Sequence, residues 1–297
     1  MRSLFKQTFY EGQRRFARLC MQWLPNGSLT KLPIFILHSI AKTASDMAVS
    51  EASFRSQLYA LLEAGYRCMD LPDALRALTA PEPLPQPAFC LTFDDGYRNL
   101  YECGLKILED LNLTATVFVT VSFIEGRIRP PWHSRDAALL REYSRSGDHF
   151  HPLDWFQLCE MLAGGRVRVG SHSVDHYLAG KLPEPELRRE ICDSKKLLED
   201  RLGIAVPFFS YPYGVRRHGA YSARTEAMVR EAGYHCSLVS EIGRAAVGTG
   251  PWLLPRIPLV DPDTGLDACA KAAGAYDWVA FAQQSFQNLF PNPHIAQ

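Results

Sequence analysis

Apolar and polar residues alternate along the chain with two different periods, and together these predict an α/β fold. Short apolar runs predict buried strands, and apolar residues spaced three or four apart predict helices with one buried face. The strand-like runs lie at residues 33–38, 66–69, 89–93, 115–121, 167–169, 206–210 and 253–259, and the helical patterns at 50–65, 100–111, 186–202 and 223–232. This alternation predicts an α/β barrel, in which functional groups gather at the carboxyl ends of the strands.

Turn and cap residues support these boundaries. Ser50 can cap the first of these helices and Gly65 can end it. Residues 81–87 carry a proline at every second position, which predicts a stiff surface connection within one domain. Residues 123–156 show no clear period and are expected to form loops above the strand ends. We therefore expect one domain at residues 31–262, preceded by a helix within 1–30 and followed by a helical tail at 263–297.

Composition narrows the functional classes. The 297 residues include 47% hydrophobic residues, enough for a large core. Lys and Arg number 32 and so do Asp and Glu, so no overall charge favours nucleic acid as a partner. The eight cysteines form no CxxC pair, which favours free thiols in a reducing compartment.

The first 24 residues mix apolar side chains with five basic ones and do not form an uninterrupted apolar segment. We therefore expect neither a cleaved signal peptide nor a membrane span, and a cytoplasmic location. The pattern predicts a basic amphipathic helix ending at residues 25–27. This helix has two interpretations that its amphipathicity alone does not separate: a peripheral contact with an anionic membrane surface, or a helix packed on the barrel.

Two adjacent carboxylates, Asp94 and Asp95, follow the strand at 89–93 and precede Gly96. Carboxylates at the end of a buried strand repel each other and lose hydration unless a cation or a proton lies between them. The alternative is an Asx turn that caps the next helix.

A second polar group follows the strand at 167–169. His172 and His176 are four residues apart, a spacing that places both on one face of a helical turn, within reach of one metal ion. An aspartate with two histidines is a common metal-binding set that leaves positions open for water and substrate. The alternative, surface or capping histidines, does not account for the two aspartates at the other strand end.

The segments TFDDG at 92–96 and HSVDH at 172–176 resemble the first two motifs of the polysaccharide deacetylases, the NodB-like carbohydrate esterase family 4. FSYPYG at 209–214 resembles the third motif, and the three occur in the family's order. The resemblance extends from about residue 32 to residue 259. It implies a distorted (β/α)7 barrel that hydrolyses the acetamide of an N-acetylated amino sugar to acetate and a free amine.

The resemblance also implies roles for individual residues. Asp95, His172 and His176 would bind one divalent metal, most simply Zn²⁺, with Co²⁺ or Ni²⁺ as alternatives, and Asp94 would be the general base. The backbone N–H of Tyr213 would stabilise the oxyanion. No LxH motif follows the third motif, but Leu37-His38-Ser39 resembles the shifted version of the exopolysaccharide-deacetylase branch. This assigns the general acid to His38.

One position departs from the family pattern. The third motif often begins with an arginine that orients the catalytic aspartate, and Ser210 occupies that place here. Arg256 is the natural substitute donor. Trp132, in the irregular region, could stack on a sugar ring or simply be packed.

Two other functions remain open at this point. One is removal of a formyl or other acyl group from a lipid-linked sugar or a small amide, which would use the same residues. The other is a sugar-binding protein without catalysis, against which the intact Asp94 argues.

Overall fold

A closed ring of seven parallel strands forms the centre of the molecule. The computed structural model describes residues 12, 29–44, 48–130, 132 and 150–279. Around the ring, in chain order, lie β2 (Ile34–Leu37), β6 (Ala88–Phe93), β7 (Ala115–Val119), β8 (Val167–Ser171), β9 (Phe208–Ser210), β10 (Cys236–Ile242) and β12 (Leu254–Pro258). β2 pairs with both β6 and β12, and this double pairing closes the barrel. The predicted (β/α)7 barrel is therefore confirmed.

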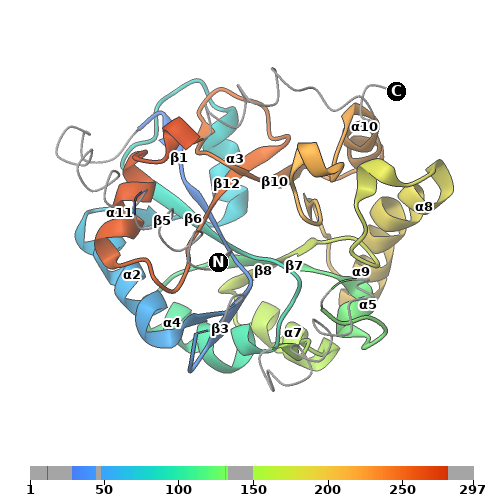
Figure 1. The fold of residues 1–297 in the computed structure, drawn as a ribbon, viewed down its shortest axis with the longest axis horizontal. Helices are drawn as coiled ribbons and strands as arrows, with labels where there is room; N and C mark the ends of the chain where they lie inside the picture. Colours follow the sequence, from blue (N-terminus) through green and yellow to red (C-terminus); the bar gives the residue numbers. More distant parts are fainter. Residues whose placement is uncertain (1–11, 13–28, 45–47, 131, 133–149, 280–297) are drawn as a thin grey trace.

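Helices form an outer ring around these strands (Figure 1). They are α2 (Glu51–Glu63), α3 (Leu71–Thr79), α4 (Leu105–Asp110), α5 (Val121–Ile124), α7 (Trp155–Ala163), α8 (Glu184–Arg188), α9 (Ser194–Leu202), α10 (Ala223–Glu231) and α11 (Gly265–Ala273). Two π-helical turns, η1 (Leu100–Gly104) and η4 (Arg189–Asp193), lead into α4 and α9, and the 3-10 turns are η3 (Ala179–Lys181) and η5 (Arg216–His218). The hydroxyl of Ser50 accepts a hydrogen bond from Ser53 N at 3.3 Å, so the predicted cap of α2 is present.

Short strands complete the structure. β1 (Lys31–Leu32) pairs with β11 (Ala245–Ala246), β3 (Ser39–Ala41) pairs with β4 (Ala48–Ser50), and β5 (Arg67–Cys68) extends the edge of β6. Of these, only β5 follows from the sequence pattern, and the pattern also misses β10. The described cysteines are all free thiols, as their spacing predicts.

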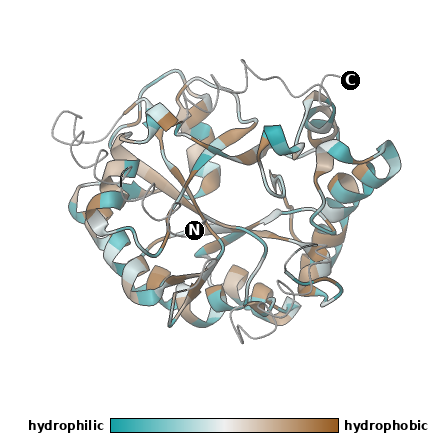
Figure 2. Cartoon of the chain, in the orientation of Figure 1, coloured by the Kyte–Doolittle hydropathy of each residue, from teal (hydrophilic) through white to brown (hydrophobic). Residues whose placement is uncertain are grey.

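Side chains of the barrel strands point alternately into the ring and outward to the helices. A buried cluster joins strands from around the ring and defines the barrel interior; it includes Ile34, Cys90, Phe118, Phe208, Leu238 and Leu254. The residues that alternate with these along the strands, such as Phe35, Leu91 and Val117, belong to a second cluster, which the strands share with the helices. Figure 2 shows apolar residues along much of the central strands and a mixture of apolar and polar residues on the outer helices. By this alternation, residues 38, 94 and 172 continue the inward-facing rows at the carboxyl end of the barrel.

The last described helix lies against the first. Cys269 of α11 contacts the Ala60 carbonyl of α2 at 3.4 Å, and Gln57 of α2 donates to the Val260 and Asp263 carbonyls at 2.9 Å. The predicted N-terminal helix and the rest of the predicted tail lie outside the described residues. Across the described part of the chain, no helix has the length and apolar character needed to cross a membrane.

Candidate metal and catalytic centre

The two adjacent aspartates lie in a sharp turn at the end of β6. Asp94 N donates to the Leu37 carbonyl at 2.9 Å, and Thr120 N donates to the Asp95 carbonyl at 3.1 Å. Asp95 has φ 74° and Gly96 has φ 91°, in the left-handed region that non-glycine residues rarely adopt. The turn is thus tied to the strands on both sides of β6, and it directs two neighbouring carboxylates to different partners.

The two histidines lie in a loop after β8, and the predicted helical turn is wrong. Ser173 has φ 70° and His176 has φ 60°, which no right-handed helical turn contains. His172 N donates to the Val119 carbonyl at 2.9 Å and extends the pairing of β7 with β8. The loop nevertheless brings both imidazole rings to Asp95, with ring centroids 5.0 Å apart.

Asp95, His172 and His176 form a compact buried cluster, with exposed fractions of 1%, 2% and 4%. The Asp95 Oδ1 atom is 3.4 Å from His172 Nε2 and 3.3 Å from His176 Nε2. Ligand atoms about 2.0–2.2 Å from a tetrahedral Zn²⁺ lie about 3.3–3.6 Å from one another. Neither Asp95 oxygen meets a hydrogen-bond donor of normal geometry among the described residues. A buried carboxylate without donors, beside two imidazole nitrogens at this spacing, fits a divalent cation.

The protonation state of His172 also suits a metal ligand. Its Nδ1 lies 2.8 Å from the Ser210 carbonyl, which can only accept, so the proton is on Nδ1 and the Nε2 lone pair faces Asp95. Burial lowers the pKa of His172 to about 4, although the Asp94 carboxylate opposes this shift. The ring is therefore neutral at pH 7. Burial raises the pKa of Asp95, but His176, His38 and His172 lower it by more, so the carboxyl is ionised.

Asp94 is held by the guanidinium of Arg256, which is fully buried. Two parallel hydrogen bonds join them, from Nη1 to Oδ1 at 2.7 Å and from Nη2 to Oδ2 at 2.6 Å. The guanidinium is itself fixed, because Nε donates to the Val239 carbonyl at 3.0 Å and Nη2 donates to the Ser210 hydroxyl at 2.9 Å. Burial raises the pKa of Asp94, but Arg256 and His172 outweigh that effect and hold the pKa below its usual value. Arg256 of β12 thus holds Asp94 in place. Ser210 of β9 makes only a longer hydrogen bond to the same carboxylate, at 3.3 Å.

The remaining predicted residues surround this centre. His38 follows β2, next to Asp94 on the neighbouring strand, and its charge helps lower the pKa of both aspartates. The Tyr213 ring is 4.7 Å from the His176 ring and 41% exposed, so it lies at the rim. The Trp132 ring stacks on His176 at 4.5 Å and contacts Phe123 edge-on. All eight predicted residues therefore lie in or beside one site.

One residue of this environment, Glu190, is not singled out by the sequence. It is buried beside the His172–His176 loop and comes from η4. Its only sequence signal is a carboxylate between Leu187 and Ile191, on the apolar face of the predicted helix. Of the other histidines considered, His133 and His149 lie outside the described residues. The carbonyl of His151 accepts from Arg98 N at 2.9 Å.

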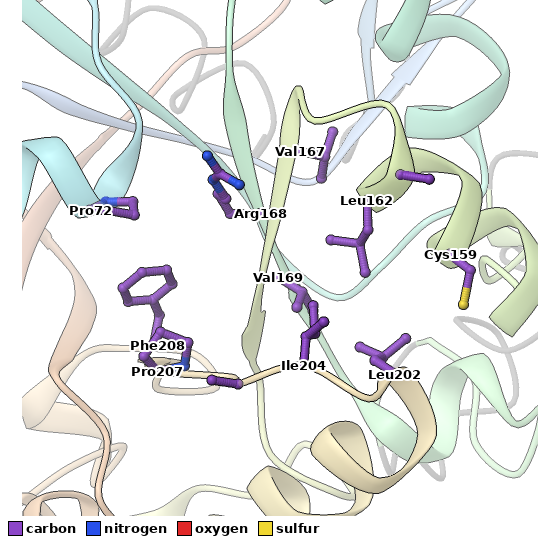
Figure 3. A pocket seen from close by; sticks show the side chains of 12 residues that line it. Pro72, Cys159, Leu162, Val167, Arg168, Val169, Leu202, Ile204, Pro207 and Phe208 are labelled. Atoms are coloured by element: carbon purple, nitrogen blue, oxygen red, sulfur yellow. The ribbon is translucent and has the colours of Figure 1, made fainter.

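A separate hollow of about 560 Å³ lies at the opposite end of the barrel (Figure 3). It is lined by α7, the end of α9 and the first residues of β8 and β9, including Val167 and Phe208. The lining is mainly apolar and contains none of the metal-cluster residues. The chemistry predicted from the sequence belongs to the carboxyl end of the strands and not to this hollow.

Comparisons with known proteins agree with this geometry. The sequence model of the family described as polysaccharide deacetylase matches residues 82–237. This chain is 26% identical over 254 residues to the protein named putative polysaccharide deacetylase YxkH of Bacillus subtilis (strain 168). That alignment covers 86% of this chain and 78% of YxkH. The poly-β-1,6-N-acetyl-D-glucosamine N-deacetylase of Escherichia coli (strain K12) is 26% identical over 58% of this chain and 25% of its own length.

Solved structures share the fold. The Streptococcus pyogenes deacetylase PplD, solved with acetate, superposes with a TM-score of 0.67 at 22% identity, covering 82% of this chain and 98% of PplD. IcaB from Ammonifex degensii gives a TM-score of 0.66 at 24% identity, covering 82% of this chain and 97% of IcaB. With a family match over more than half of its residues, the chain belongs to the polysaccharide deacetylase family, hydrolases of carbon–nitrogen bonds that are not peptide bonds.

Proposed function

We propose that this protein is a metal-dependent N-deacetylase that acts on an N-acetylated amino sugar within a glycan. The observation that carries the proposal is the pairing of two different carboxylate environments at adjacent positions. Asp95 faces two imidazoles without other donors, whereas Asp94 is fixed by a buried arginine. A sugar-binding protein without catalysis has no need for an ionised Asp94 fixed by a buried arginine beside the metal cluster.

The proposed chemistry divides among the residues as follows. Asp95, His172 and His176 would hold Zn²⁺ or a similar ion, which would polarise an amide carbonyl and lower the pKa of bound water. Asp94 is ionised at neutral pH and takes a proton from the attacking water as the new C–O bond forms. The Tyr213 N–H would donate to the developing oxyanion. His38 would protonate the nitrogen as the C–N bond breaks, releasing acetate and a free amine.

The shape of the rim supports a sugar as substrate. Tyr213 is partly exposed and its ring contacts the His176 imidazole edge-on. The Trp132 ring stacks on the same imidazole. Aromatic rings at the edge of a polar site suit the apolar face of a sugar ring. The name of the E. coli relative, which specifies an N-acetylglucosamine polymer, makes a β-linked N-acetylglucosamine glycan the first substrate to test.

Mass spectrometry of candidate substrates tests the proposal. Purified protein loaded with Zn²⁺, and in parallel with Co²⁺ or Ni²⁺, is incubated with acetylated glucosamine oligomers and with acetylated and formylated lipid-linked sugars. We expect loss of acetyl groups from the oligomers, at a rate about 10²–10⁴-fold lower for the Asp94→Asn variant. Reaction with the lipid-linked sugars alone would assign the alternative deacylase activity. Binding of sugars without any turnover would contradict the enzymatic assignment of the site.

A further inference from the structure

A buried carboxylate from a neighbouring helix holds the loop that joins the two candidate histidine ligands. Glu190 Oε2 accepts hydrogen bonds from Val174 N at 3.1 Å and from Asp175 N at 2.8 Å. Within the loop, the Ser173 Oγ accepts a hydrogen bond from His176 N at 3.0 Å. Two of the three residues between the ligands, Val174 and Asp175, therefore bond to Glu190 through their backbone N–H groups, and the third, Ser173, bonds to the backbone of His176.

Charged neighbours fix the same loop from its outer side. The Asp175 carboxylate accepts hydrogen bonds from the Ser122 hydroxyl and from Arg189. Arg189 Nη1 also donates to Glu190 Oε1 at 3.0 Å, so one guanidinium joins the two carboxylates. Glu190 is 1% exposed, and burial raises the pKa of its carboxyl, an effect that the Asp175 N–H and Arg189 offset in part.

The π-helical turn η4 brings Glu190 to this position. Such a turn adds one residue to the helical repeat and often marks a functional site. Ser194 follows Glu190 by four residues and lies on the same side, where its Oγ is 2.8 Å from Ser171 Oγ at the end of β8. Ser194 therefore contacts the end of β8, and Glu190 contacts the loop between His172 and His176.

The loop needs external bonds because its own backbone is unfavourable. Ser173 and His176 both have positive φ values, and neither is a glycine. On the basis of the proposed metal-dependent function, we propose that Glu190 is a positioning residue that sets the affinity of the Asp95–His172–His176 centre for its divalent ion. Without an acceptor at this position, the loop N–H groups would be buried unpaired and the loop would leave the conformation that aims both imidazoles at Asp95.

Zinc affinity of the full chain, measured by competition with a chromophoric chelator, tests the role of Glu190. Glu190→Leu removes the acceptor, and Glu190→Gln keeps one carbonyl oxygen. Two controls lie on the same helical segment: Glu186→Gln makes the same chemical change at an exposed position, and Leu187→Ala weakens core packing without touching the loop. Hydrogen–deuterium exchange of the peptide containing residues 172–176 in the metal-free protein gives a second readout that needs no metal.

We expect Glu190→Leu to lower zinc affinity by about 10- to 100-fold and to speed exchange in the loop. Glu190→Gln should lose affinity several-fold, and both controls should match the wild type. Wild-type affinity in Glu190→Leu, or an equal loss in Leu187→Ala, would overturn the proposal. If Glu190→Leu does not fold, Glu190→Gln decides: a several-fold loss with faster exchange supports the role, and wild-type values overturn it. Wild-type protein that binds zinc without deacetylating any substrate would contradict the proposed function and leave this comparison intact.

Discussion

Two aspartates that are adjacent in sequence have different chemistry because the backbone turns between them. Asp94 continues the inward-facing row of β6 and meets a guanidinium, whereas Asp95 has a left-handed conformation and meets two imidazoles. At the scale of the residue, the sequence predicts both aspartates as site residues. The contact between Arg256 and Asp94 follows from the family resemblance and not from any local pattern, because the two residues are 162 positions apart and only barrel closure brings them together.

The same substitution should act differently at the two aspartates. Asp94→Asn keeps the shape of the side chain and leaves the metal cluster intact, so metal content should stay at the wild-type level while kcat falls by about 10²–10⁴-fold. Asp95→Asn should instead lower metal content, and excess metal should restore part of the rate. Metal analysis and kcat on one acetylated substrate measure both. An active Asp94→Asn enzyme would refute the assignment of Asp94 as the base.

Loss of the buried guanidinium should destabilise the protein in a pH-dependent way. The folded-state pKa of Asp94 lies below its usual value, so the ionised carboxylate contributes stability above a pH of about 4, and that contribution is lost as pH falls through the folded-state pKa. Arg256→Met leaves burial as the main influence and raises the pKa, so ionised Asp94 becomes unfavourable. We expect the free energy of unfolding to fall by about 3–5 kcal/mol near pH 7. This loss should become smaller at pH values below the raised pKa of Asp94.

Urea unfolding of metal-free protein at several pH values measures this loss. Arg76→Met makes the same substitution at an exposed position of α3 and is a control that should change stability little. A loss for Arg256→Met that stays constant from pH 7 down to acid conditions would show that the arginine acts through packing alone.

The proton donor is tested by the pH–rate profile. A general acid must be protonated, so activity should fall as pH rises through the pKa of that group. His38→Ala should keep its metal, lose rate and flatten this high-pH limb. His151→Ala, in a loop on the same chain, should keep the wild-type profile. A His38→Ala enzyme with wild-type rate and profile would move the assignment to His133, His149 or His151.

At the scale of the element, the sequence predicts the strands and helices whose signal is local. The cap at Ser50 and the left-handed Gly65 mark the ends of α2, as the sequence predicts. β10 is missed because Ser237, Ser240 and Glu241 interrupt its apolar run. The loop at 172–176 is predicted as a helical turn because a spacing of four suits both, and its left-handed residues are not glycines. Strand pairs of two residues, such as β1 with β11, have no periodicity to detect.

A glycine in β8 shows how closely the barrel interior is packed. A Cβ on Gly170 would lie 2.4 Å from Cε1 of the Phe118 ring, far inside normal contact. Because both residues lie in the barrel, Gly170→Ala should force the ring or the strand to move and should cost about 1–3 kcal/mol. Gly164→Ala is a matched control, since the nearest atom to its added Cβ is 3.6 Å away and its φ of −66° suits any residue.

Denaturant unfolding of the two alanine variants compares their free energies of unfolding. The control should lie within a few tenths of a kcal/mol of the wild type or slightly above it. Equal stabilities for the two variants would show that the Phe118 ring has room to turn, and that the packing at this level of the barrel is looser than the distances indicate.

At the scale of the whole molecule, the site exists because the barrel closes. His38 directly follows β2, the aspartates follow β6 and Arg256 lies in β12. Pairing of β2 with both neighbours places the first and last barrel strands side by side. The resemblance in sequence, which extends from about residue 32 to residue 259, implies this closure. What it does not give is the place of the first 24 residues, which lie outside the described part of the structure.

From the five basic residues among the first 24, against the single acidic Glu11, we propose that this segment contacts an anionic membrane surface, with packing on the barrel as the alternative. Each basic side chain near such a surface contributes about 1 kcal/mol, and salt weakens the attraction. We therefore expect the full chain to co-sediment with vesicles that contain phosphatidylserine, less so at 0.5 M salt and not with neutral vesicles. Deletion of residues 1–24, or Arg14→Glu combined with Arg15→Glu, should abolish binding and leave the thermal midpoint unchanged. Failure of the full chain to bind, together with a lower thermal midpoint after the deletion, would show that this segment packs on the barrel.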